Sequence, residues 1–407
     1  MDERIIPFAE VARSPLIVDA IYQGDRKGGA ADDPLPRLLD VSNQGGFRYR
    51  GSLAVPHCAS CGGLVQPWVM TMATVFWPEQ AVVASIPKSG EVMAVDKAAI
   101  GKFMDLRKQG FDRCMHLDFK CEKDAIRAHS VQNGKILDLL QKDNHVIIPQ
   151  PKFDPTKGPS FELGLIGRNK ALTFTGLCSA HDTELFKLAD TLSLDVGNKK
   201  QLEQYGYRAV MKELHTCIEE GARFFALDAD QVKKGLVKPG EGAAGHMAIF
   251  FSDRSWRLFR YRSQNFDTPI LEGKDPPIEH RIITLDGQKP TLAVSSFFGV
   301  GTEKNGNTIG VMLSVVPEPE KTTAVLSYAT AQKDAITKAL PDLFDDGADH
   351  KKALSHTVLQ RVENFTLAPA FYDGWSEAKK KKVVAYFNES LHSGEPPPKD
   401  AEFSLFA

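Results

Sequence analysis

The sequence predicts an α+β protein with a metal-bound module in its first half and an antiparallel sheet with helices in its second half. Cys114 and Cys121 flank a short loop, and Cys178 and His181 open an amphipathic helix about sixty residues later. Short runs rich in β-branched and aromatic residues then follow one another between residues 247 and 328, separated by turn sequences. Helical spacing of apolar residues closes the chain.

The composition is that of a globular protein of two or three domains. The chain has 407 residues, 42% of them hydrophobic and 25% charged, so a packed core is feasible. Its net charge is −2, so any contact with nucleic acid must come from a local basic patch. No apolar run predicts a membrane span or a secretory signal. We therefore expect a cytoplasmic protein whose six cysteines are reduced and available for metal.

Shifts in composition divide the chain into four regions. We expect an N-terminal turn-rich α+β region at residues 1–110, the metal module at 111–195, an α+β domain at 196–395 and a tail at 396–407. The strands expected in the first region are 16–22, 82–86 and 91–95. In the module, apolar spacing predicts helix within 124–141, and residues 146–148 and 171–175 predict strands, the first of them ended by Pro149.

The second half is expected to run from helix to sheet to helix. Apolar spacing predicts a long helix over 201–225, followed by a glycine-rich linker at 238–245. The expected strands are 247–251, 281–285, 291–297, 308–315 and 322–328. The dipeptides Asp286-Gly287 and Asn305-Gly306 predict hairpin turns, so the sheet should be antiparallel. Helices are expected at 331–340, 350–362 and 375–391.

The spacing of Cys114, Cys121, Cys178 and His181 predicts a zinc site. Zinc takes four nitrogen or sulfur ligands, and two pairs on short turns commonly supply them. A knuckle followed by a pair at a helix N-terminus is the layout of a treble-clef finger, and that helix end favours thiolate over thiol. The six residues between Cys114 and Cys121 exceed the usual two to four. The alternative is that Cys114 and Cys178 are small buried residues without a ligand role.

A second pair, Cys58 and Cys61, has the spacing of a knuckle as well. It could compete with Cys114 and Cys121 for Cys178 and His181, or it could complete a separate site with His57 or His116. A thiol-redox role for this pair is the third interpretation.

Around His129 the chain resembles a family of largely uncharacterised bacterial proteins. Four segments carry the resemblance, namely 126–133, 144–146, 173–178 and 181–186. That family is in turn similar to the HNH endonucleases, which are built on a treble clef. In those enzymes a histidine shortly after the first cysteine pair is the general base, and a residue directly after the ligand pair on the helix binds a catalytic divalent cation.

The resemblance implies that His129 is the base and that Asp182 binds Mg²⁺ or Mn²⁺, while zinc is structural. It also implies that Asn133, or alternatively Asn169, stands for the middle asparagine of the HNH pattern. Ala128 precedes His129 where those enzymes usually carry an acidic residue. The alternative is that His129 packs within the fold and Asp182 is an ordinary acid in the first turn of a helix.

A second resemblance lies at the N-terminus. Residues 15–22, 32–35 and 43–48 are similar to the start of some bacterial HNH-containing restriction proteins. This resemblance implies DNA as the substrate and anti-phage defence as the setting.

Four arginines form a candidate nucleic-acid surface. They are Arg254, Arg257, Arg260 and Arg262, and they alternate with aromatic residues. Interleaved basic and aromatic side chains can bind phosphates and stack on bases. The alternation also fits an ordinary amphipathic or edge strand.

The sequence therefore predicts an HNH-like, divalent-metal-dependent nuclease that acts on DNA. The alternative is a non-catalytic protein whose zinc module organises a binding surface for a protein or nucleic-acid partner.

Overall fold

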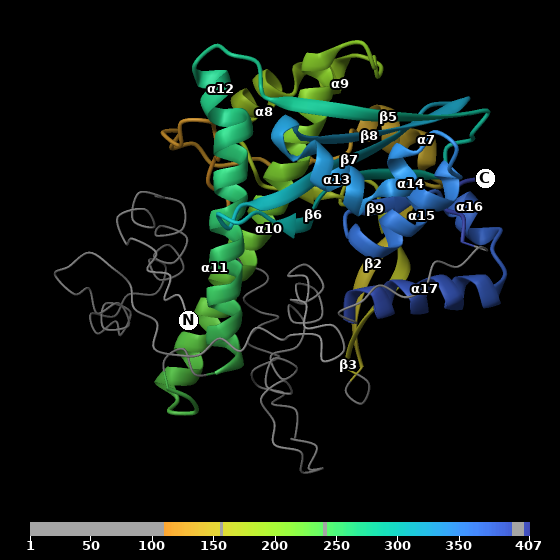
Figure 1. Cartoon of the computed structure of the whole chain (residues 1–407). Helices are drawn as coiled ribbons and strands as arrows, with labels where there is room; N and C mark the ends of the chain where they lie inside the picture. Colours follow the sequence, from red (N-terminus) through yellow and green to blue (C-terminus); the bar gives the residue numbers. More distant parts are fainter. Residues whose placement is uncertain (1–109, 155–157, 239–241, 393–402) are drawn as a thin grey trace. The chain divides into compact units, whose positions relative to one another are not determined.

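The computed structural model describes residues 110–154, 158–238, 242–392 and 403–407 (Figure 1). They form a mixed α+β fold with two compact units. The larger unit holds the described residues of 112–215 and 257–407, and the smaller holds residues 110–111 with the described residues of 216–256. Two long helices, α10 (Lys199–Lys233) and α11 (Ala243–Arg262), contribute to both units.

The larger unit is built on a seven-stranded sheet of order β3-β2-β9-β6-β7-β8-β5, in which every neighbouring pair is antiparallel. Its strands are β2 (His145–Asp154), β3 (Gly158–Gly167), β5 (Ile278–Asp286), β6 (Leu292–Thr302), β7 (Thr308–Pro317), β8 (Lys321–Ala329) and β9 (Phe365–Leu367). A separate two-stranded ribbon pairs β1 (Ala128–His129) with β4 (Thr173–Phe174). The expected α+β class with an antiparallel sheet is confirmed.

Short helical segments complete the larger unit. Those before β5 are the π-helical turn η1 (Asn133–Leu137), α7 (Asp138–Leu140), α8 (Ser179–Leu185), α9 (Lys187–Thr191), the π-helical turn η2 (Ser263–Asp267) and α12 (Thr268–Leu271). Those after it are the 3₁₀ turn η3 (Thr330–Gln332), α13 (Lys333–Ala339), α14 (Pro341–Phe344), α15 (His350–Arg361), α16 (Pro369–Asp373) and α17 (Glu377–His392). The three helices expected after residue 330 correspond to α13, α15 and α17 and are confirmed.

The sheet is buried on both faces. Strands β6, β7 and β8 each carry a run of seven or more buried residues, as strands covered on both sides do. One face packs against α13, α15, α17 and the segment 403–406, which Figure 1 shows in blue beside the sheet. The first half of α10 lies on the other face, where a methyl group on Gly206 would stand 3.3 Å from Cβ of Ser327.

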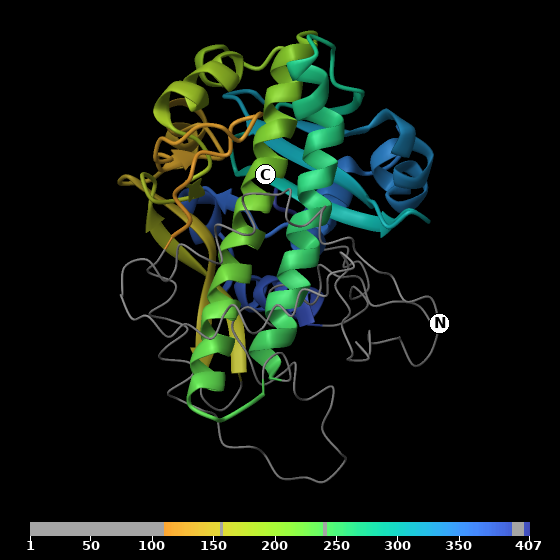
Figure 2. The same ribbon diagram turned by 90° about the vertical axis from the view of Figure 1, so that its left-hand side faces the viewer.

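The smaller unit contains the second half of α10, from Thr216, and the part of α11 that ends at Trp256. These two helix segments lie side by side (Figure 2). The rings of Phe224 and Phe251 stack between them, with centroids 5.7 Å apart. The strand expected at 247–251 is wrong, because this segment is helical. Residues 244, 247, 248 and 251 are buried at the i, i+3, i+4, i+7 spacing of one helix face, which the run of apolar residues concealed.

Two turn predictions have different outcomes. Asn305-Gly306 joins β6 to β7 in a hairpin, and Gly306 has a φ of 84°, so this prediction is confirmed. Asp286-Gly287 does not make a hairpin, because β5 pairs with β8 and not with the following strand β6. The turn dipeptide marks the end of β5, and tertiary packing decides which strand lies beside it.

Strand β2 does not end at Pro149 as expected but continues to Asp154. The carbonyl of Ile147 accepts a hydrogen bond from Oγ1 of Thr366, so the backbone groups of Ile147 face β9. Pro149 and Pro151 lie two and four residues after Ile147, so their backbone nitrogens are also on the side away from β3. The N–H groups that proline lacks are therefore not needed for pairing with β3. The helix expected over 124–141 is also wrong over its first part, which forms β1, and is reduced to η1 and α7 in its second part.

Candidate metal centre and neighbouring site

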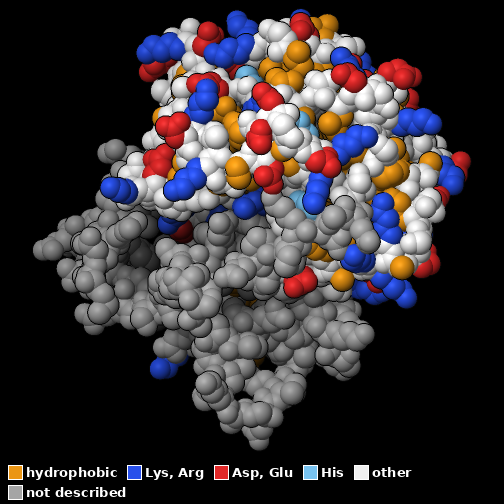
Figure 3. All heavy atoms as spheres, turned by 45° about the vertical axis from the view of Figure 1, so that its right-hand side comes forward, with side chains coloured by type: hydrophobic (Ala, Val, Ile, Leu, Met, Phe, Trp, Pro, Cys, Tyr) orange, Lys and Arg blue, Asp and Glu red, His pale blue; other side chains and the backbone are white. Residues whose placement is uncertain are grey.

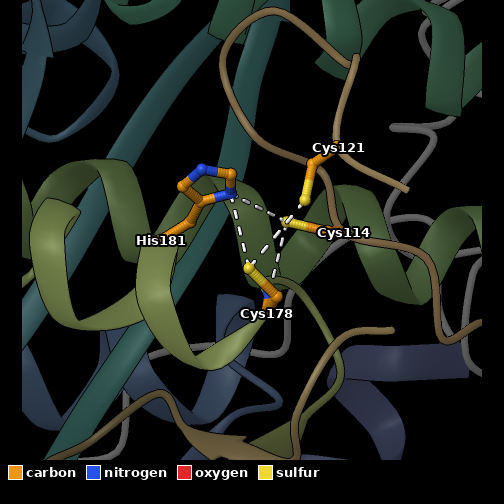
Figure 4. A group of neighbouring side chains, drawn as sticks. All are labelled: Cys114, Cys121, Cys178 and His181. Atoms are coloured by element: carbon orange, nitrogen blue, oxygen red, sulfur yellow. Dashed lines mark hydrogen bonds between the residues drawn. The ribbon is translucent and has the colours of Figure 1, made fainter. Parts of the chain in front are cut away.

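Two backbone segments bring the four expected ligands together. Cys114 and Cys121 lie on the loop that precedes β1, and the amide of Cys178 donates a hydrogen bond to Sγ of Cys114 at 3.2 Å. Cys178 is the N-cap of α8, and His181 lies in its first turn. Figure 4 shows the four side chains pointing toward one another.

The four donor atoms form a compact set. Three thiol sulfurs and one imidazole nitrogen lie within 4.8 Å of one another. Nδ1 of His181 is 3.4 Å from Sγ of Cys114 and 3.5 Å from Sγ of Cys178, and Sγ of Cys121 is 3.9 Å from Sγ of Cys178. Three cysteines with one histidine is a donor set that suits zinc. Among the residues that the structure describes, this is the group of Cys, His, Asp and Glu that could hold a metal ion.

The thiols differ in how easily they lose a proton. Burial raises the pKa of Cys114 to about 12, although the backbone amides of Cys178 and His116 oppose this. Burial also acts to raise the pKa of Cys178, but hydrogen bonds from the His181 amide and from neighbouring thiols outweigh it and leave that pKa below its ordinary value. Cys178 is at a helix N-terminus, where amides favour the thiolate that a metal requires.

His181 is held in place by a second histidine. The rings of His116 and His181 stack with centroids 3.7 Å apart and an angle of 18° between their planes. Nδ1 of His116 is 2.9 Å from a carboxylate oxygen of Asp118. Burial, followed by the charge of His116, lowers the pKa of His181. His181 is therefore more readily neutral, which is the form that binds metals.

His129 lies at the end of β1, directly opposite Thr173 of β4. Its Nε2 is 3.1 Å from the carbonyl oxygen of Arg168. A carbonyl can only accept, so Nε2 carries the hydrogen and Nδ1 of the neutral ring carries the lone pair. Burial lowers the pKa of His129, and the charges of Arg208 and Arg168 lower it further, against the Arg168 hydrogen bond and the Asp190 charge. The geometry thus provides a neutral imidazole with a basic Nδ1.

Asp182 follows His181 in the first turn of α8. Burial raises the pKa of its carboxyl group, which the charge of Arg208 lowers and that of Asp190 raises. Asn133, at the start of η1, donates from Nδ2 to Oδ1 of Asn169 at 2.9 Å, so the two alternative middle asparagines contact each other. The Oδ1 atom of Asn133 is buried without a hydrogen-bond partner in the described part of the chain.

Sequence reasoning missed the ion pair between Asp190 and Arg208. Arg208 of α10 donates from both Nη atoms to the carboxylate of Asp190, at 2.7 and 2.6 Å, and its guanidinium lies 4.1 Å above the ring of Phe186. The charges of this pair act on both His129 and Asp182. In the sequence, Arg208 stands among apolar residues of a helix, and this could have indicated a buried ion pair. No neighbouring residue indicates that Asp190 is its partner.

The interpretation of the four arginines as part of a strand is wrong, because Arg254, Arg257, Arg260 and Arg262 lie on helix α11. Arg262 is fully buried, so its guanidinium is not available to a phosphate. Arg257 donates from Nη1 to the carbonyl of Gly306 at 2.7 Å. Alternating basic and aromatic residues suggested a period of two, whereas burial of Ser255, Leu258 and Arg262 follows the helical period. On the face in Figure 3, acidic and basic side chains of the described residues are interspersed.

Cys58 and Cys61 lie outside the residues that the structure describes. Within the described ranges, no helix has both the length and the apolar character needed to cross a membrane.

Comparison with known proteins relates part of the chain to a known family. A family model described as the N-terminal region of the restriction endonuclease AspBHI matches residues 16–62. This segment overlaps the one for which the sequence indicated a resemblance to restriction proteins, and the match carries no HNH component. No curated protein and no solved structure matches the chain.

Proposed function

We propose that this chain is a divalent-metal-dependent nuclease that acts on DNA, with a structural zinc ion in a treble-clef-like module. The observation that carries the proposal is the hydrogen bond of His129 to the Arg168 carbonyl, which leaves Nδ1 as a proton acceptor. The match of residues 16–62 to a restriction endonuclease supports DNA as the substrate and restriction of foreign DNA as the setting.

In this proposal Cys114, Cys121, Cys178 and His181 would hold zinc, which is the metal that their donor set fits. A rigid scaffold of this kind keeps the neighbouring β1–β4 ribbon and α8 in one arrangement. The order of knuckle, ribbon and ligand-bearing helix supports the treble-clef assignment.

His129 would take a proton from a water molecule at Nδ1 while the water oxygen attacks a phosphate of DNA. Asp182 would supply a carboxylate ligand to Mg²⁺ or Mn²⁺ in its ionised form. A bound divalent cation stabilises the negative charge that develops on the phosphate and the leaving oxygen. Asn133 would orient this site through its pairing with Asn169.

A second candidate function is a non-catalytic, zinc-structured binding protein with a protein or nucleic-acid partner. The partial burial of His129 and Asp182 favours it, because substrate must reach both groups in a nuclease. Arg254, Arg257 and Arg260 remain candidates for contact with nucleic acid in either case.

The test is cleavage of modified and unmodified plasmid DNA by the purified chain with Mg²⁺ or Mn²⁺. His129→Ala should abolish cleavage and retain zinc. His350→Ala is the matched control, because Nε2 of His350 is likewise 3.0 Å from a backbone carbonyl, that of Asp345. Cleavage that survives His129→Ala contradicts His129 as the base. A wild type without cleavage under all these conditions contradicts the nuclease and leaves the binding protein.

A further inference from the structure

The loop between Cys114 and Cys121 is longer than an ordinary zinc knuckle, so contacts outside the loop must help to hold it. Its own turn includes the hydrogen bond from the Phe119 amide to the His116 carbonyl at 2.9 Å. Phe119 has a φ of 54°, which is costly for a bulky residue and persists only where surroundings impose it. A conformation of this kind calls for an anchor.

Arg262 contacts this loop at two points. Its Nη2 donates to the carbonyl oxygen of Met115 at 2.9 Å, and its guanidinium lies 4.7 Å from the ring centroid of Phe119. The amide of Met115 donates to the carbonyl of Gly176 at 2.8 Å, on the segment that leads to Cys178. Both backbone groups of Met115 are therefore held, the carbonyl by Arg262 and the amide by the segment that leads to Cys178.

Arg262 is itself held rigidly. Its Nε lies 3.1 and 3.0 Å from the two carboxylate oxygens of Asp267, and the hydroxyl of Tyr207 donates to the same carboxylate at 2.6 Å. Arg262 is 0% exposed and Asp267 2% exposed. Burying such a pair costs free energy that the hydrogen bonds only partly recover, so stability alone is a weak reason for it. A role in placing the loop accounts for the cost.

We propose that Arg262 is a positioning residue of the metal centre, which presets the loop from Cys114 to Cys121 before metal binds. This inference rests on the proposed assignment of the four ligands to zinc. Arginine suits the role because its planar fork can bond Asp267 and Met115 at once and stack on Phe119. A lysine ammonium offers a point charge and cannot satisfy both partners in that geometry.

The experiment measures Co²⁺ affinity of the full chain by titration against a competing chelator, using the absorption bands of thiolate-bound cobalt. Arg262→Met should weaken Co²⁺ affinity about 10- to 100-fold, the effect of losing hydrogen bonds from a charged group. Arg262→Lys should recover part of that affinity. Phe119→Leu, which leaves the Arg262–Asp267 pair intact, should weaken it about 2- to 10-fold.

Arg208→Met is the matched control. Arg208 is also a buried arginine paired with an aspartate and stacked on an aromatic ring, but its partners are Asp190 and Phe186. The Arg208→Met substitution should lower the free energy of unfolding and leave Co²⁺ affinity at the wild-type value. A loss of affinity equal to that of Arg262→Met would show a general effect of destabilisation and would overturn the proposal.

The remaining outcomes are equally decisive. Wild-type affinity in folded Arg262→Met overturns the proposal. If Arg262→Met does not fold, Phe119→Leu decides it, since weakened affinity supports the positioning role and wild-type affinity overturns it. A wild-type chain that binds neither Co²⁺ nor Zn²⁺ overturns the zinc assignment together with this inference. A chain that binds Co²⁺ tightly but cleaves no DNA contradicts the nuclease alone.

Discussion

Nε2 of His129 donates a hydrogen bond to the carbonyl oxygen of Arg168 at 3.1 Å. This contact ties a candidate base on β1 to the turn that follows β3, and it selects the tautomer with a free Nδ1. Burial holds the pKa of His129 below its ordinary value of 6.5. The imidazole is therefore neutral, and able to accept a proton, over a wider range of pH than an exposed histidine.

The first prediction concerns the pH dependence of DNA cleavage. A base acts only when unprotonated, so the rate should fall as pH drops through the lowered pKa of His129, and the acidic limb should have its midpoint below 6.5. Arg208→Met removes a positive charge that lowers this pKa and should move the limb to higher pH. A pH–rate profile under single-turnover conditions checks both. A midpoint at or above 6.5 in the wild type contradicts the assignment.

The second prediction separates scaffold from chemistry at the metal centre. Cys178→Ser removes a proposed zinc ligand that is also the N-cap of α8, so metal content should fall well below about one zinc per chain and the melting temperature should drop. His129→Ala should change neither quantity. Metal analysis with differential scanning calorimetry provides the measurement. Full zinc content in Cys178→Ser would remove Cys178 from the ligand set.

The third prediction concerns His280 of β5. Its Nδ1 is 2.8 Å from Oγ of Ser327, and its Nε2 is buried without a hydrogen-bond partner among the described residues. Burial, followed by the charge of Lys199, lowers its pKa from 6.5 to about 4. Between these values the unfolded chain binds a proton that the folded chain does not, so stability is lost as pH falls from 6.5 toward 4.

The difference between those two pKa values corresponds to a change of about 3 kcal/mol in the free energy of unfolding. Urea unfolding at several pH values should therefore show a steeper loss of stability in acid for the wild type than for His280→Gln. His350→Ala should keep the wild-type slope. Equal slopes for the wild type and His280→Gln would mean that His280 takes up its proton in the folded state.

Local spacing was sufficient to predict elements whose pattern and environment agree. Strands β6, β7 and β8 carry β-branched and aromatic residues between turn sequences, and α15 has its N-cap at Asp349, whose side chain accepts from the amide of Lys352. Cys178 and His181 are one helical turn apart, so their meeting depends on α8 alone. Their approach to Cys114 and Cys121 depends on the β1–β4 ribbon, which cysteine spacing indicates only indirectly.

Spacing could not predict contacts that tertiary packing decides. The partner of Arg208 is Asp190 on another helix, and one partner of Arg262 is the backbone carbonyl of Met115, 147 residues away in sequence. Arg262 looked like a surface residue because arginine usually is one, and only burial reveals its role. For the same reason the segment 247–251, with its run of apolar residues, suited a strand or a buried helix equally well.

The final prediction concerns the exposed edge of the sheet. Strand β3 is an edge strand, and the carboxamide of Asn388 on α17 pairs with the backbone of Phe161 in place of a neighbouring strand. The Phe161 amide donates to Oδ1 at 2.7 Å, and Nδ2 donates to the Phe161 carbonyl at 2.9 Å. This pairing stabilises the hairpin and engages backbone groups at a sheet edge, a position at which a strand of another chain can pair.

Asn388→Ala should lower the free energy of unfolding by about 1–3 kcal/mol, because it removes two hydrogen bonds between the Asn388 side chain and the backbone of Phe161. Asn388→Asp should have a smaller effect, since a carboxylate can still accept from the amide. Urea unfolding measures the stability, and light scattering measures self-association through the freed edge. Lys381→Ala, at an exposed position of the same helix, is the control. If the stability and scattering of Asn388→Ala equal those of this control, hydrogen bonds from water replace those of Asn388 at the edge of β3 without loss, and the prediction is wrong.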